Sequence, residues 1–165
     1  MAGGGGFAVR VEGIFFDAAH FATYGGHCEP LHGHTYQVAA EVEGELTDDS
    51  WVVDFTRLKA ILRQICQEID HRMVLQMESR ILKIEALEGA WRVITPAGAS
   101  YTLPSLDVAE LPIDNTTAER LAEWFSGRVW QAVEHRSARI QSVSVEVWEG
   151  PGQRASYKRL HLPLG

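Results

Sequence analysis

The residues best suited to chemistry lie together in the stretch CEPLHGH, at positions 28–34. This stretch holds a thiol (Cys28), a carboxylate (Glu29) and two imidazoles (His32 and His34). Residues i and i+2 of a strand project to the same face, so the two histidines are expected to project together. Two imidazoles on an apolar face are costly to bury without partners, and imidazole nitrogen is a preferred ligand of Zn²⁺. The stretch therefore favours a metal pair over two neutral core histidines.

A third histidine could complete the metal site. His20 ends an extended segment at 7–20, and antiparallel pairing would place it beside His32 and His34. Its alternative role is that of a strand-end histidine bonded to the backbone. His27 is a rival third ligand, ranked lower because it lies in a glycine-rich loop. Three histidines without a fourth protein ligand are typical of a catalytic zinc site with an open position for water or substrate.

The thiol and the carboxylate that precede the histidine pair each have two interpretations. As a fourth zinc ligand, Cys28 would close the site and make it structural. As a free thiol beside a cation, it would have a lowered pKa and could act as a general base. Glu29 is either a solvated loop carboxylate or a second base that reaches the same pocket.

Two further pairs stand at the ends of predicted helices. Asp70 and His71 are either a surface aspartate beside a histidine that favours the helix C-terminus, or a carboxylate-assisted imidazole that shuttles protons. Thr116 and Thr117 begin a second predicted helix. Thr116 is the expected cap, which leaves Thr117 free to face a ligand.

Glu149 continues the apolar side of a predicted strand. It shares its parity with Val143, Val145 and Val147, so its carboxylate is expected to need a partner. That partner is either an internal arginine or a guanidine-like heterocycle that donates two N–H bonds.

The elements that must position these residues indicate an α+β domain. Alternation in HTYQVAAEVEG predicts a half-buried antiparallel strand. Short apolar runs divided by Glu-Gly and Pro-Ala-Gly turns predict a hairpin insertion over 77–112. The expected architecture is a single domain over 1–165, with two helices on one face of a four-stranded antiparallel sheet. The predicted strands are 7–20, 34–44, 140–150 and 155–162.

Both predicted helices carry recognisable start signals. The first spans 54–71 with Asp54 as its N-cap, and its apolar spacing places Cys66 in the core. The second begins at TTAERLAEWF, where Thr116 and Glu119 form a T-x-x-E capping box.

Composition narrows the class of protein. The 165 residues carry a net charge of −7, which argues against a nucleic-acid or anionic-membrane binder. No apolar run approaches the roughly 18–20 residues of a membrane span, and the N-terminus lacks a secretory pattern. Two cysteines are too few for a disulfide framework, so a reducing cytoplasm is expected. His135 and His161 are expected at the surface or at a sheet edge.

Taken in order, these segments resemble the 6-pyruvoyltetrahydropterin synthase / 6-carboxytetrahydropterin synthase family. The matching pieces are FFDAAHF, C-x-x-x-H-G-H, WVVDFTRLK, IDH, NTTAERLA and VEVWE followed by ASY. The resemblance implies the tunnelling fold, in which two stacked trimers form a hexamer with active sites between subunits. It also implies a residue set: zinc on His20, His32 and His34, Cys28 as proton acceptor with Asp70 and His71, and Glu149 as pterin anchor.

The reaction that the resemblance implies starts from 7,8-dihydroneopterin triphosphate. Triphosphate elimination would give 6-pyruvoyltetrahydropterin, and loss of a two-carbon fragment would give 6-carboxy-5,6,7,8-tetrahydropterin. The spacing of Cys28 to His32 fits the carboxy-forming branch. Glu29 stands where another branch uses glutamate and cleaves the side chain to 6-hydroxymethyl-7,8-dihydropterin for folate synthesis. A non-catalytic, zinc-stabilised pterin-binding module is the alternative from another class.

Overall fold

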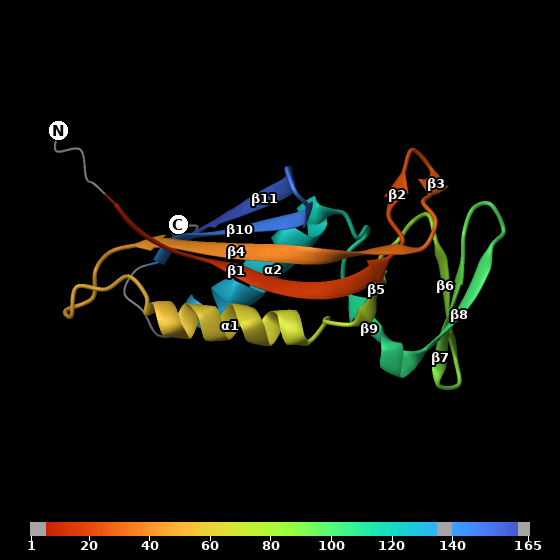
Figure 1. The fold of residues 1–165 in the computed structure, drawn as a ribbon, viewed down its shortest axis with the longest axis horizontal. Coiled ribbons are helices and arrows are strands. Elements are labelled where there is room, and N and C mark those ends of the chain that lie inside the picture. The colour runs from red at the N-terminus through yellow and green to blue at the C-terminus, as the bar shows by residue number, and fades with distance from the viewer. Residues whose placement is uncertain (1–5, 135–139, 162–165) are drawn as a thin grey trace.

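The main layer of the molecule is a six-stranded sheet. The structure, a computed structural model, describes residues 6–134 and 140–161. The strand order is β11–β10–β4–β1–β5–β9, in which β1, β4, β10 and β11 pair antiparallel while β5 and β9 pair parallel (Figure 1). The strands are β1 (Phe7–His20), β4 (His32–Gly44), β5 (Arg72–Gln76), β9 (Val108–Leu111), β10 (Ile140–Gly150) and β11 (Gln153–Leu160).

The α+β class is confirmed, but the predicted strand number is wrong. The four expected strands are present, and β5 and β9 extend the sheet beyond β1. Both added strands are short, and both are largely buried, so neither shows an alternating pattern. β5 begins directly after the predicted end of the first helix at residue 71, where the chain turns at His71, whose φ is +57°. The helix itself ends earlier than predicted, at Gln67.

Two helices cover one face of the sheet (Figure 1). They are α1 (Phe55–Gln67) and α2 (Ala118–Glu134). Asp54 caps α1 as predicted, because its side chain accepts a hydrogen bond of 2.7 Å from the Arg57 amide. The predicted capping box of α2 is wrong. Thr117 instead occupies the cap, and its hydroxyl accepts from the Arg120 amide at 3.5 Å.

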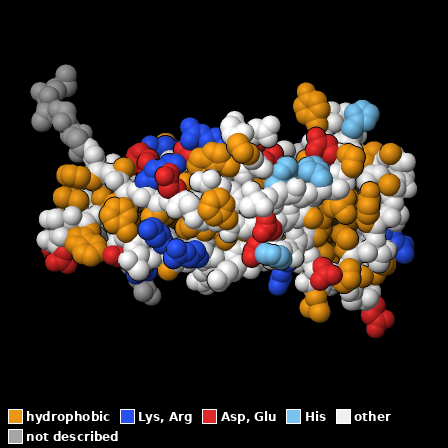
Figure 2. Space-filling model, in the orientation of Figure 1, with side chains coloured by type: hydrophobic (Ala, Val, Ile, Leu, Met, Phe, Trp, Pro, Cys, Tyr) orange, Lys and Arg blue, Asp and Glu red, His pale blue; other side chains and the backbone are white. Residues whose placement is uncertain are grey.

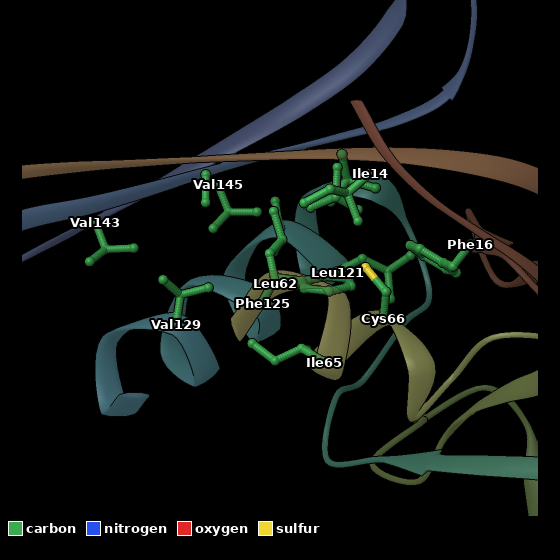
Figure 3. Packing of buried hydrophobic residues seen from close by; sticks show 14 of the residues in the cluster. Ile14, Phe16, Leu62, Ile65, Cys66, Leu121, Phe125, Val129, Val143 and Val145 are labelled. Carbon is green, nitrogen blue, oxygen red and sulfur yellow. The ribbon is translucent and has the colours of Figure 1, made fainter. Parts of the chain in front are cut away.

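The main core lies between this sheet face and the helices (Figure 3). Val143, Val145 and Val147 of β10 are fully buried against α2 residues such as Phe125. Cys66 of α1 is buried in the same cluster, as predicted. Packing of this core therefore determines which residues of β4 and β10 face the helices, and so the direction of the side chains near the ends of these strands.

A bulge in β1 decides where His20 points. The register of β1 against β4 shifts between Val11 and Ile14, and Gly13 has a φ of +73°. Val11 lies on the core face before the shift and Ile14 lies on it afterwards, so the inward parity changes from odd to even residues. His20 consequently shares the core face of the sheet.

The segment predicted as a hairpin insertion forms a three-stranded antiparallel sheet. Its strands are β6 (Lys83–Leu87), β7 (Ala90–Ile94) and β8 (Ser100–Pro104), in that order. A short 3₁₀ helix (Ser105–Asp107) connects it to β9. A separate hairpin of β2 (Thr23–Tyr24) and β3 (His27–Cys28) links β1 to β4 and projects near this small sheet (Figure 1).

The small sheet carries a second core. Figure 2 shows hydrophobic side chains gathered over this end of the molecule. The buried members are Phe21, Met73, Leu75, Leu82, Val93 and Val108. This set, called the second core below, lies next to the strand ends that hold the predicted site.

The remaining predictions concern the two histidines expected at the surface, and membrane-spanning segments. His161 is exposed and stacks on Trp130 with ring centroids 5.9 Å apart, while His135 lies outside the described residues. Within residues 6–134 and 140–161, no helix is long and apolar enough to cross a membrane.

Candidate functional site

Strand register brings three histidines together. His20 pairs with His32 across β1 and β4, and Ala18 pairs with His34. One ring nitrogen from each of His20, His32 and His34 can be chosen so that all lie within 4.8 Å of one another. The antiparallel pairing that the sequence predicts for His20 is therefore present, and His27 lies apart in the β2–β3 hairpin.

The hydrogen bonds of two rings leave their inner nitrogens without protons. His20 Nδ1 lies 2.9 Å from the Thr116 carbonyl, and His32 Nδ1 lies 2.7 Å from the Pro30 carbonyl. Carbonyl oxygens only accept, so each Nδ1 carries the proton and each Nε2 of a neutral ring presents a lone pair.

Those two lone pairs face each other across 3.1 Å, the distance between the Nε2 atoms of His20 and His32. Burial also lowers the pKa of His20 to about 4, so protonation is a poor way to relieve the contact. A cation between the nitrogens relieves it directly. Tetrahedral zinc with Zn–N bonds near 2.05 Å separates its nitrogens by about 3.3 Å, which this spacing fits. The donor set is thus suited to a metal ion.

Gly33 is required by the close approach of β1. A Cβ added there would lie 2.7 Å from the Ala18 carbonyl oxygen and 3.3 Å from the Ala19 Cα. The His-Gly-His spacing therefore reflects sterics at the middle residue as well as chemistry at the outer two.

Gly33→Ala should push β4 away from β1 and separate the histidine nitrogens. We expect a loss of stability of about 1–3 kcal/mol, typical of overpacking, together with weaker metal binding. Thermal unfolding and metal titration would measure both. Gly6→Ala is the matched control, because an added Cβ there meets nothing within 4 Å. Unchanged metal affinity in Gly33→Ala would contradict this role.

A pocket of about 390 Å³ opens beside the histidines. Its lining includes His20, His32, Glu29, Thr117 and Glu149. Burial raises the pKa of the Glu149 carboxyl, which lies in this pocket near the C-terminal end of β10. No hydrogen bond joins that carboxylate to another residue within the described ranges, so it stands ready to accept donors from a ligand.

The side chains of Cys28 and Glu29 lie in different environments. Glu29 lines the histidine pocket, with its carboxylate 3.8 Å from His32 Nε2. Cys28 does not line this pocket and instead packs against the second core. Burial, and then the charge of Glu29, raise the pKa of the thiol in the absence of metal. Cys28 is also absent from the histidine cluster, so a closed site with sulfur coordination has no geometric support.

The two threonines differ in a way that the sequence did not reveal. Thr117 lines the pocket, as predicted. Thr116 is fully buried, and its hydroxyl donates toward the Phe21 carbonyl and Gln76 Oε1, at 3.1 and 3.0 Å. Its contribution to the site is the carbonyl that orients His20.

Asn115 is a positioning residue that sequence reasoning missed. Its side-chain amide donates to the Thr23 carbonyl at 2.8 Å and accepts from the Thr23 amide at 3.1 Å. It thereby ties the β2–β3 hairpin to the start of α2. The only available signal was its place in the Asn-Thr-Thr sequence before the helix.

Asp70 and His71 form a separate cluster with Asp17. His71 Nδ1 lies 3.0 Å from the Asp70 carboxylate, and His71 Nε2 lies 3.9 Å from that of Asp17. The Asp17 amide donates to Asp70, which lowers the pKa of the Asp70 carboxyl. Asp17 alternates with Ala18 along β1, so this cluster lies on the face of the sheet opposite the histidine pocket.

The fold and the histidine cluster define a tunnelling-fold protein with a candidate metal centre. A family model described as 6-pyruvoyl tetrahydropterin synthase matches residues 9–160. The chain belongs to that family.

The similar proteins include enzymes with different names. A Pyrococcus horikoshii protein provisionally assigned as a 6-carboxy-5,6,7,8-tetrahydropterin synthase is 33% identical over 91% of this chain and 89% of its own. A dihydroneopterin monophosphate aldolase of Pyrococcus furiosus is 27% identical over 82% and 83%.

A solved structure agrees over nearly the whole chain. The 6-pyruvoyl tetrahydropterin synthase of Plasmodium vivax has a TM-score of 0.88 and 27% identity, covering 96% of this chain and 100% of that one. Variants of that enzyme with a catalytic glutamate replaced by alanine or cysteine match equally well.

Proposed function

We propose that this protein is a zinc-dependent lyase that acts on the C6 side chain of 7,8-dihydroneopterin triphosphate. Family membership supports the coarser class, a tetrahydropterin-synthase type of enzyme. The observation that carries the finer proposal is the meeting of two kinds of group at one pocket. These are two imidazoles of the histidine cluster, His20 and His32, and the carboxylates of Glu29 and Glu149.

His20, His32 and His34 would hold the zinc ion. Zinc bound there supplies Lewis-acid chemistry that acidifies the side-chain hydroxyls of the substrate. The carbonyls of Thr116 and Pro30 keep the rings of His20 and His32 in the tautomer with a free Nε2.

Glu149 would anchor the pterin ring. A carboxylate can accept two N–H bonds from the 2-amino group and N3–H of a pterin, an arrangement like that with arginine. Because Glu149 shares one pocket with His20 and His32, the anchored ring would direct its C6 side chain toward the histidine cluster. Thr117 offers a hydroxyl to the same ligand.

Glu149→Gln should weaken substrate binding, raising KM by about 10- to 100-fold, because a charge-assisted hydrogen bond is worth about 1.5–3 kcal/mol. Since burial raises the pKa of Glu149, binding should also weaken on acidification at a higher pH than for an ordinary glutamate. Steady-state kinetics across pH measures both. Glu119→Gln, the same charge change at the same pocket, is the control. Equal effects from the two variants would refute a direct contact.

Glu29 would be the residue that moves protons between the side chain and the ring. Its carboxylate lines the pocket beside His32, whereas Cys28 faces the second core. A base must come within hydrogen-bonding reach of the proton that it abstracts. This geometry favours side-chain cleavage to 6-hydroxymethyl-7,8-dihydropterin, as expected for a glutamate base. The names of the Pyrococcus horikoshii relative and of the Plasmodium vivax enzyme favour 6-carboxy-5,6,7,8-tetrahydropterin or 6-pyruvoyltetrahydropterin as the alternative product.

The second catalytic cluster would come from a neighbouring copy. Asp70 and His71 do not line the pocket that holds His20, His32 and Glu149, so within one chain they would not reach a ligand bound there. His71 instead shares a second hollow with His34. The outer edges of β9 and β11 pair with no other strand of the described chain, and Phe15 on the helix-free face is 58% exposed. Both features suit the association of sheets into the hexamer that we propose.

Mass spectrometry of the products formed from 7,8-dihydroneopterin triphosphate tests the proposal. We expect 6-hydroxymethyl-7,8-dihydropterin as the main product, with 6-carboxy-5,6,7,8-tetrahydropterin as the second. Substrate that remains unchanged after incubation with the zinc-loaded oligomer would refute the proposed function. It would leave the fold and the family membership in place.

A further inference from the structure

The Cys28 side chain belongs to a different environment from the residue that follows it. Cys28 is half-buried and packs on the second core, whereas Glu29 lines the histidine pocket. Adjacent residues of an extended chain point to opposite sides, so one local backbone conformation can serve only one of the two in the pocket. The contacts that fix the backbone conformation at residues 28–29 therefore determine whether Cys28 or Glu29 lies in the pocket.

The small sheet β6–β8 builds much of the second core. Its pairs Ile84–Val93 and Val93–Tyr101 line up across the three strands on one face. Val93 is fully buried, and Tyr101 packs on Phe21 with ring centroids 4.9 Å apart. The neighbouring positions face away and form ion pairs such as that between Lys83 and Glu85. The apolar face of the small sheet thus meets the cluster on which Cys28 rests.

The rest of the β2–β3 hairpin is held independently. The Glu29 amide donates to the Ala22 carbonyl at 2.9 Å, and Thr23 pairs with Cys28. Asn115 holds Thr23 from the side of α2. These hydrogen bonds hold the backbone of the hairpin beside the pocket. The Cys28 thiol packs against the apolar surface of the second core.

We propose that β6–β8 is a specificity element that keeps Cys28 in the second core and leaves Glu29 as the base in the pocket. Val93 and Tyr101 are then positioning residues, which act on the reaction through the direction of the 28–29 pair. This inference deepens the proposed function and rests on it. It assigns a role to the 77–112 insertion that its sequence pattern did not suggest.

Thiol labelling tests the position of Cys28 without any need for activity. We would treat the zinc-loaded oligomer with iodoacetamide and follow each cysteine by peptide mass spectrometry. Val93→Ala and Tyr101→Ala should label Cys28 at least about threefold faster than the parent, because access and thiolate character set the rate. Thr102→Ala, on the exposed face of β8, should match the parent. Continued protection of Cys66, which is 3% exposed, shows that the variants remain folded.

Product partition tests the specificity role. In Val93→Ala and Tyr101→Ala the ratio of 6-carboxy to 6-hydroxymethyl product should rise, and adding Cys28→Ala should abolish the rise. A merely structural role would lower both products in proportion. Labelling rates and product ratios that equal the parent's in both variants would overturn the inference. If no protein, the parent included, converts the substrate, the proposed function fails, while the labelling rates still decide where the thiol lies.

Discussion

Glu29→Gln should lower kcat by about 10²–10⁴-fold, the usual contribution of a positioned general base. The amide keeps the size of the side chain but cannot accept a proton. Zinc content and KM should change little. Glu29 is not one of the three residues proposed to hold zinc, and Glu149, not Glu29, is the proposed anchor of the ring. Steady-state kinetics with zinc analysis provides the measurement.

Two comparisons make the Glu29 result specific. Glu88→Gln, at the exposed turn between β6 and β7, makes the same chemical change away from the pocket and should leave kcat unaltered. Cys28→Ala should lower kcat less than Glu29→Gln, since the thiol does not line the pocket. A larger loss in Cys28→Ala than in Glu29→Gln would show that the thiol is the principal base.

His32→Ala should remove zinc from the protein and reduce turnover by at least about 10³-fold, since Lewis-acid stabilisation is worth several kcal/mol. His32 would be a ligand of the proposed zinc ion, because its Nε2 faces that of His20 and its Nδ1 is already fixed by the Pro30 carbonyl. Elemental analysis gives zinc per chain, and product formation gives turnover.

His27→Ala is the matched control for the metal site. His27 is an exposed imidazole in the β2–β3 hairpin, outside the cluster, so this variant should retain zinc and turnover. Equal zinc loss in both variants would mean that the metal binds elsewhere. Full zinc retention in His32→Ala would exclude the three-histidine site.

The clustering of His20, His32 and His34 was predictable from local pattern, and the direction of the 28–29 pair was not. The i, i+2 spacing of His32 and His34 and the pairing of β1 with β4 follow from strand geometry. Even so, the parity of His20 depends on the bulge near Gly13, so strict alternation from Val11 would have placed it on the wrong face.

The unpredicted features arise from contacts between segments far apart in the sequence. β5 and β9 join the sheet through parallel pairing, which leaves no alternating pattern to detect. Thr116 does not cap the helix as expected, because its buried hydroxyl donates a hydrogen bond to Gln76 instead. Asp70 and His71 were grouped with the zinc ligands and Cys28 by resemblance, yet the structure pairs them with Asp17, outside the pocket lined by His20 and His32.

The most direct test of the central claim is metal-dependent turnover of 7,8-dihydroneopterin triphosphate. Protein stripped of metal by a chelator would be compared with the same protein restored with zinc, and products would be identified by mass spectrometry. The proposed function predicts no pterin product from the stripped protein and full recovery at one zinc ion per chain. Equal product formation with and without zinc, or none after restoration, would contradict it.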